Sequence, residues 1–175
     1  MLELASNTIK VLGIFGRLCP EHEAFLDSIE EKYSTKPVGE AYSILRHLTL
    51  TFIPDATVAD IREQLTLLQV LHSFLPLKIK VDKLFVKDEE SLPGAEHIAV
   101  EFKAEQTKEL IQFIENKAGK SKTVATWYTK VVWFVPKENQ KAAMAALSAL
   151  KELEFSDFYL VSNKQDEPNT LFTAT

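Results

Sequence analysis

Polar and apolar residues alternate along residues 46–54, and the rest of the chain can be interpreted around this segment. A period of two over this length predicts a half-buried β-strand, because successive side chains of a strand point to opposite faces. One face would carry His47, Thr49 and Thr51, and the other would carry Leu48, Leu50 and Phe52. An imidazole beside a hydroxyl on a rigid strand can transfer a proton and hold an anion. Taken alone, however, these polar residues are more typical of an ordinary exposed strand.

The remaining hydrophobic pattern predicts strands and helices in a regular order. Alternating or short apolar runs predict strands at residues 9–18, 77–86, 97–102, 126–136 and 155–162, with a last edge strand at 170–175. Apolar residues at helical spacing predict helices at 20–33, 56–74, 105–117 and 137–153. Pro20 suits the first position of the first helix, and Asp55 is a candidate cap for the second.

This order contains an internal repeat. The series strand, helix, strand, helix, strand occurs twice, and the middle strand ends in Phe52-Ile53-Pro54 in the first half and in Phe134-Val135-Pro136 in the second. We therefore expect an α+β fold of two similar lobes, each with a small antiparallel sheet covered by helices on one face. The two uncovered faces would meet across a central cleft, and His47 and Thr49 would line it.

Composition narrows the possible functions. The chain has 175 residues, 46% of them hydrophobic, which predicts one globular domain over residues 1–175 made of the two lobes. A formal charge of -5 argues against broad nonspecific binding to nucleic acid, but it is compatible with a small pocket that binds an anion. Cys19 is the single cysteine, and we find no signal peptide and no apolar run long enough for a membrane span. We expect a cytoplasmic protein.

The segment Arg46-His47-Leu48-Thr49-Leu50-Thr51-Phe52 resembles a motif of the 2H phosphoesterases. This superfamily includes the bacterial RNA 2′,3′-cyclic phosphodiesterases once called 2′-5′ RNA ligases (LigT-like proteins), and its members carry two copies of His-any-Thr/Ser, one per lobe. The strands at 11–15, 76–79 and 158–162 also fall where that family has them, so the similarity extends over nearly the whole chain. The resemblance implies the bilobed fold and a site that uses neither a metal nor a cofactor.

The second copy of the motif lacks its histidine. It should lie between Trp127 and Phe134, and two registers compete there. Matching the two Pro-ending segments puts Thr129 opposite His47 and Val131 opposite Thr49. Shifting by one residue puts Tyr128 opposite His47 and Lys130 opposite Thr49, with Thr129, Val131 and Trp133 on the covered face. We prefer the second register, because the first would bury the ammonium of Lys130 against the helices.

The family resemblance implies a role for each candidate residue. In the family one histidine accepts a proton and the other donates one, while the Thr/Ser hydroxyls bind the phosphate. Here His47 would be catalytic, and Thr49, Tyr128 and Lys130 would bind the substrate, a nucleotide or RNA-end phosphate in the cleft of a monomer. The missing histidine leaves two functions open: a metal-independent cyclic phosphodiesterase, and a binding or regulatory module of the same fold without turnover. A third interpretation is an unrelated α+β protein.

Other residues with chemical potential have plainer explanations. His97 begins the strand equivalent to residues 11–15, and we expect it to be an exposed residue at a strand end. Trp127, Tyr128 and Trp133 could stack a base, although at least one Trp should pack in the core. The sequence contains no glycine-rich phosphate loop, and its four histidines lack the spacing of metal ligands.

Overall fold

A computed structural model describes residues 9–35, 46–88, 96–119, 122, 128–164 and 170–172. The expected strand positions of Thr126 and Trp127, and those of residues 173–175, lie outside these ranges. The strands in the described part are β1 (Ile9–Leu18), β2 (His47–Thr49), β3 (Ile53–Ala56), β4 (Leu77–Asp88), β5 (Glu96–Phe102), β6 (Tyr128–Val132), β7 (Glu152–Lys164) and β8 (Thr170–Phe172). The helices are α1 (Pro20–Tyr33), α2 (Val58–Leu71), α3 (Ala104–Ala118) and α4 (Lys137–Leu147), with a 3-10 helix η1 (His72–Phe74).

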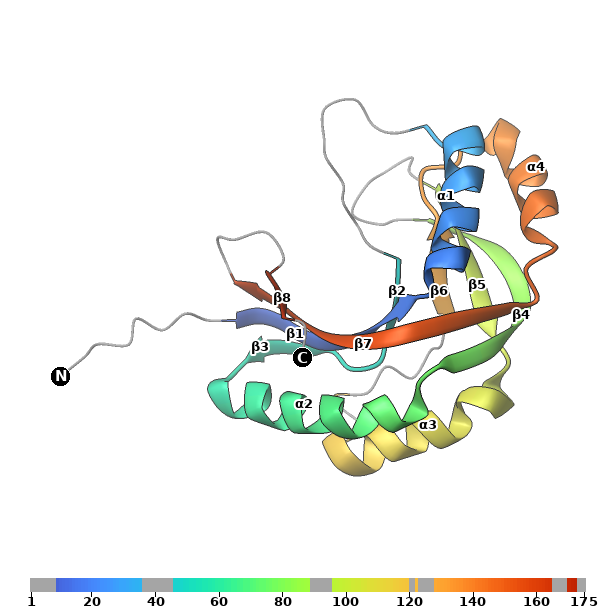
Figure 1. The fold of residues 1–175 in the computed structure, drawn as a ribbon. Coiled ribbons are helices and arrows are strands. Elements are labelled where there is room, and N and C mark those ends of the chain that lie inside the picture. The colour runs from blue at the N-terminus through green and yellow to red at the C-terminus, as the bar shows by residue number, and fades with distance from the viewer. Residues whose placement is uncertain are drawn as a thin grey trace.

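All of these strands join one antiparallel sheet in the order β2-β1-β7-β4-β5-β6, with β3 also paired to β1 and β8 to β7. The first residues of β4 pair with β7 and the later ones pair with β5, so β4 passes from one part of the sheet into the other. The two small sheets expected from the sequence are thus joined through β4. The sheet curls, and the helices lie outside it, α1 beside α4 and α2 beside α3 (Figure 1). This arrangement confirms the expected α+β class.

The pairing of the strands follows the repeat in the sequence, except that the two halves exchange their last strands. Within the first half β1 pairs with β2, and within the second half β5 pairs with β6. The last strand of each half pairs with the first strand of the other half, β4 with β5 and β7 with β1. The helix contacts also cross between the halves. We propose from these pairings that the two lobes are related by approximate two-fold symmetry and that the two halves of the chain exchange their last strands.

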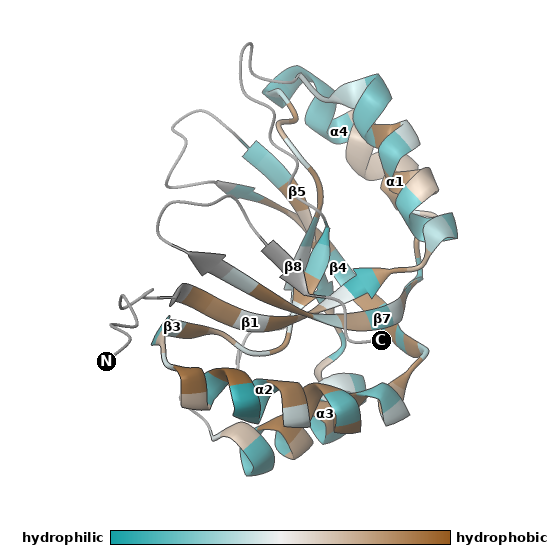
Figure 2. Ribbon diagram, turned by 60° about the vertical axis from the view of Figure 1, so that its left-hand side comes forward, coloured by the Kyte–Doolittle hydropathy of each residue, from teal (hydrophilic) through white to brown (hydrophobic). Residues whose placement is uncertain are grey.

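The core lies between the curled sheet and the helices. Its largest fully buried side chains include Tyr159, Phe155 and Phe158 on β7 and Leu12 and Ile14 on β1. Figure 2 shows that β1 is largely apolar, whereas the helices mix apolar and polar residues, as helices with a single buried face do. These two central strands therefore form a rigid base for the shorter strands at the sheet edges.

The start of α2 corrects one expectation about capping. Asp55, the expected cap, lies in β3 with a positive φ of 50°. The cap is instead Thr57, whose hydroxyl accepts a hydrogen bond from the backbone N–H of Asp60 while the Asp60 carboxylate accepts one from the N–H of Thr57. This reciprocal pair is a capping box, which satisfies two backbone donors that the helix itself leaves open.

Candidate functional site

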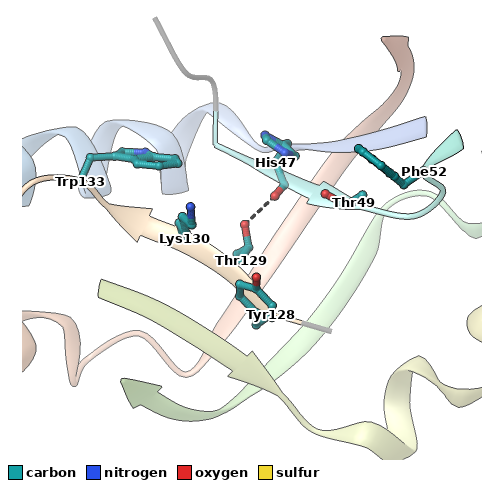
Figure 3. A pocket seen from close by; sticks show the side chains of 7 residues that line it. All are labelled: His47, Thr49, Phe52, Tyr128, Thr129, Lys130 and Trp133. Atoms are coloured by element: carbon teal, nitrogen blue, oxygen red, sulfur yellow. Dashed lines mark hydrogen bonds between the residues drawn. The ribbon is translucent and has the colours of Figure 1, made fainter. Parts of the chain in front are cut away.

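A pocket of about 260 Å³ lies between the two outermost strands of the sheet order, β2 and β6 (Figure 3). Its lining consists of His47, Thr49, Phe52, Tyr128, Thr129, Lys130 and Trp133. All four candidate residues from the sequence, His47, Thr49, Tyr128 and Lys130, are therefore in one place. They come from two segments that are about eighty positions apart in the chain, and they meet only because the sheet curls.

The two edge strands are in direct contact. The Thr129 hydroxyl on β6 donates a hydrogen bond of 2.5 Å to the backbone carbonyl of His47 on β2 (Figure 3). Thr129 is buried and His47 is half-buried, so this hydrogen bond is partly shielded from water and stronger than it would be at the surface. The bond fixes the separation of the strands on which the candidate residues lie.

His47 is held by an aromatic contact as well as by its strand. Its ring stacks on that of Phe15 in β1, with ring centroids 4.1 Å apart and an angle of 6° between the planes. Tyr159 of β7 packs edge-on against the other ring of this stack, Phe15, and burial raises the pKa of Tyr159 to about 12. The His47 imidazole therefore lies on an aromatic support, and the Arg17 guanidinium lies 4.8 Å from the centroid of the Tyr159 ring in that support.

The second strand presents alternate side chains to the pocket. Tyr128 and Lys130 are half-buried and line it, whereas Val131 is fully buried and Thr129 nearly so. Tyr128, Lys130 and Val131 thus face as expected from the register that pairs Tyr128 with His47 and Lys130 with Thr49, whereas Thr129, expected on the covered face, also lines the pocket. The Lys130 ammonium lies 5.0 Å from the centroid of the Trp133 ring, a cation–π contact.

Trp133 lies in the pocket lining, and the expectation that it would take the covered face is wrong. The cause is a bulge. Ala99 of β5 pairs with Lys130, but the preceding Ile98 pairs with Val132, so β6 contains one extra residue at this point. Val131 and Val132 are consequently both buried, and the next residue returns to the pocket face.

The first strand contains the same irregularity. Between Thr49 and Ile53 the chain advances four residues while β1 advances three, from Phe15 to Leu12. Leu50 and Thr51 are both completely buried as a result. The expectation that Thr51 would share the polar face of His47 is therefore wrong.

Two side chains exchange their expected faces because of this extra residue. Phe52 was expected on the covered face, but it is 44% exposed and lines the pocket. Thr51 instead points into the core, where its hydroxyl accepts from the N–H of Ile14 at 2.9 Å and donates to Gln64 at 2.5 Å. The pocket therefore has an aromatic residue five positions after each first motif residue, Phe52 after His47 and Trp133 after Tyr128. That repeated spacing is the signal in the sequence that could have identified both aromatic residues.

His97 is a buried residue rather than the expected exposed one. It is 1% exposed, and its Nδ1 accepts a hydrogen bond of 3.1 Å from the backbone N–H of Phe134. Since Nδ1 accepts, the neutral ring carries its proton on Nε2. The ring packs edge-on against Trp133, with centroids 4.6 Å apart, so His97 supports the pocket wall from behind.

Arg46 is a residue of the site region that sequence reasoning missed. It is 4% exposed, and its Nε donates to the carbonyl of Val131 at 2.6 Å, which joins the strand of His47 to β6. Its two terminal nitrogens donate to Glu23, Asp27 and Glu30 of α1 at 2.5, 2.6 and 2.8 Å.

These contacts determine the charge of Arg46 and extend to the pocket wall. Burial lowers the pKa of Arg46, but the hydrogen bonds and charges of the α1 carboxylates outweigh it and hold the pKa above its ordinary value. Glu30 also accepts from the backbone N–H of Trp133 at 3.2 Å. The spacing of the three acids, positions i, i+4 and i+7 of a predicted helix, would have indicated one acidic stripe.

The described residues contain no other obvious chemical centre. No group of three or more His, Cys, Asp or Glu side chains gathers there in a way that could hold a metal ion. Within the same ranges, no helix is long and apolar enough to cross a membrane. The pocket between β2 and β6 is therefore the site that we consider for function.

No family model and no curated protein matches this chain. Two structures of Usb1 from Kluyveromyces marxianus have a similar fold. The structure with uridine monophosphate aligns with a TM-score of 0.52 at 10% identity, over 93% of this chain and 97% of that chain. The other aligns with a TM-score of 0.53 at 9% identity, over 94% and 98%. At such low identity the likeness shows the fold alone, and it confirms the 2H phosphoesterase-like fold class.

Proposed function

We propose that this protein binds a cyclic phosphate or an RNA-end phosphodiester in the pocket between β2 and β6 and hydrolyses it without a metal ion. One observation carries the proposal: His47, Thr49, Tyr128 and Lys130 line a single pocket although they were selected from two distant segments of the sequence. The Usb1 structure with uridine monophosphate supports a nucleotide as the kind of ligand for this fold.

Each side chain has a role that its chemistry allows. The Lys130 ammonium and the Thr49 hydroxyl bind the phosphate oxygens, one as a point charge and the other as a hydrogen-bond donor. The His47 imidazole accepts the proton of the attacking water, a role worth roughly 10²–10⁴-fold in rate. The Tyr128 hydroxyl donates to the leaving oxygen. Phenols release a proton less readily than imidazolium ions do, so we expect slow turnover.

The same geometry supports a second candidate, a binding module without turnover. The observation that favours it is that the pocket lining contains His47 and Tyr128 but no second histidine. A site with one imidazole retains the phosphate-binding groups but has lost one of the two proton-transfer groups that the 2H mechanism uses. The two candidates therefore share a ligand and differ in whether the ligand is cleaved.

Replacing His47 by Ala separates these functions. We expect purified protein to bind uridine 2′,3′-cyclic phosphate by isothermal titration calorimetry and to hydrolyse it slowly in EDTA, measured by chromatography of the products. His47→Ala should reduce hydrolysis by at least about 10²-fold, because the proton acceptor is lost. His72→Ala is the matched control, since His72 lies in η1 outside the pocket lining and should leave the rate unchanged.

Three other outcomes are informative. Binding without hydrolysis in the unaltered protein would favour the module. Hydrolysis that is unchanged in His47→Ala would remove His47 from the mechanism. Absence of both binding and hydrolysis would contradict the proposed function altogether.

A further inference from the structure

Three lysines lie on the pocket side of the sheet formed by β4, β5 and β6. Residues directly opposite one another on neighbouring strands point to the same face of the sheet. Two such rows cross β4, β5 and β6, namely Lys83–Glu101–Tyr128 and Phe85–Ala99–Lys130. Lys87 lies two positions after Phe85 on β4 and therefore points to the same face. Lys83 is neutralised, because its ammonium lies 3.1 Å from the Glu101 carboxylate. Lys87 has no carboxylate partner within ion-pair distance in the described part of the chain.

Lys87 instead lies on an aromatic ring that belongs to the pocket. Its ammonium is 4.7 Å from the centroid of the Tyr128 ring, and Phe85 packs against that ring edge-on with centroids 6.0 Å apart. Tyr128 also lines the pocket. The ring contact holds the ammonium next to a residue of the pocket lining, and an ammonium on one ring face keeps N–H donors for water or for an anion.

We propose that Lys87 and Tyr128 form a second phosphate subsite, so that the ligand is a single-stranded oligonucleotide rather than a mononucleotide. The inference rests on the proposed function, since the first phosphate would lie in the pocket beside Lys130. The neighbouring phosphate of the same strand then meets the Lys87 ammonium, and a base can stack on an aromatic side chain. Because the whole chain carries a formal charge of -5, a polyanion binds where basic side chains gather, and the Lys87 ammonium adds a positive charge next to the pocket residue Tyr128.

The test compares two probes in matched variants. Uridine monophosphate and triuridylate are titrated calorimetrically into the full-length protein and into Lys87→Met, Lys87→Arg and Lys83→Met. We expect Lys87→Met to weaken triuridylate binding roughly threefold to tenfold more than uridine monophosphate binding. It should also reduce the slope of log affinity against log salt concentration by about 0.7 for triuridylate, the value for one lost contact with a single strand. Lys87→Arg should preserve both, because it keeps the charge.

Lys83→Met is the matched control. It removes a lysine from the same face of the same strand, but one that Glu101 already neutralises, and it should leave the ratio of the two affinities unchanged. Equal weakening of both probes in Lys87→Met, or the same effect in Lys83→Met, would overturn the second subsite while leaving the pocket itself intact. Failure of uridine monophosphate and triuridylate to bind the unaltered protein would instead contradict the proposed function. Circular dichroism melting curves verify that each variant is folded.

Discussion

Hydrogen bonds from three donors converge on the carboxylate of Asp60 at the start of α2. The backbone N–H and the hydroxyl of Thr57 each lie 2.7 Å from one carboxylate oxygen, and the Lys122 ammonium lies 3.1 Å from the other. These contacts, the Thr57 backbone bond first, lower the pKa of Asp60 to about 2. The carbonyl of Lys122 in turn accepts from the N–H of Phe52, so the cap of α2 is connected to the pocket wall.

The low pKa of Asp60 predicts a pH dependence of stability. Because the folded-state value is below the ordinary 3.8, its contribution is complete above pH 3.8 and is lost as the pH falls through about 2. At pH 7 we expect Asp60→Asn to lower the free energy of unfolding by about 1 kcal/mol, as the loss of a helix cap does. Urea denaturation at pH 7 and at pH 3 measures this, and the difference from the unaltered protein should shrink at pH 3. A constant difference would show that ionisation of Asp60 is irrelevant to the cap.

Single residues show where alternation stops being a reliable guide. The strand carrying His47 was predicted correctly from its period of two as far as Leu50. The side chains beyond it take the opposite faces because one extra residue intervenes, and the hydroxyl of Thr51 finds buried partners in Ile14 and Gln64. Those partners lie on β1 and α2, so no local pattern in the strand itself could have indicated them.

Elements are tied together near the pocket by Arg46. Its guanidinium contacts α1 through three carboxylates and β6 through the carbonyl of Val131, while its own backbone leads into β2. The strand and helix patterns predicted each of these elements correctly. Their connection could not be predicted, because a buried arginine next to a strand motif looks in the sequence like any basic residue at a strand end.

Replacing Arg46 by Met should therefore destabilise the protein strongly. Loss of one partner of a buried ion pair typically costs about 3–5 kcal/mol, and since the α1 carboxylates remain partly exposed we expect about 2–4 kcal/mol from chemical denaturation. Arg62→Met removes an exposed arginine of α2 and should cost less than about 0.5 kcal/mol. Equal effects of the two substitutions would mean that the buried network adds nothing to stability.

The two acids most different in exposure refine this expectation. Glu30 is 20% exposed and also accepts from Trp133, whereas Asp27 is 66% exposed. Glu30→Gln should therefore be more destabilising than Asp27→Asn in the same denaturation experiment. The reverse order would place the main stabilising interaction of Arg46 at the solvent-exposed carboxylate.

At the scale of the whole molecule, the two halves of the chain complete each other. β7, from the second half, provides the long partner of β1, and β4, from the first half, provides the partner of β5. The repeat in the sequence predicted the two series of elements and the outside position of the helices. It could not predict the exchange of last strands, because strands of similar composition can pair within a half or between halves.

This exchange predicts the behaviour of fragments. A chain cut between residues 92 and 93 yields two pieces, and we expect neither piece alone to unfold cooperatively, because each lacks a central strand of its sheet. Mixing the pieces should restore the native circular dichroism spectrum and a cooperative thermal transition. Native-like melting of either piece alone would show that a half folds independently and that the strand exchange is dispensable.

The hydrogen bond from Thr129 ends on the main chain of His47, not on its imidazole. Any amino acid at position 47 offers the same carbonyl, so the width of the opening does not depend on which side chain stands there. A substitution at position 47 therefore removes a reactive group but keeps the hydrogen bond between the two strands. The kinetics of such a variant then report the loss of the imidazole rather than a collapse of the pocket.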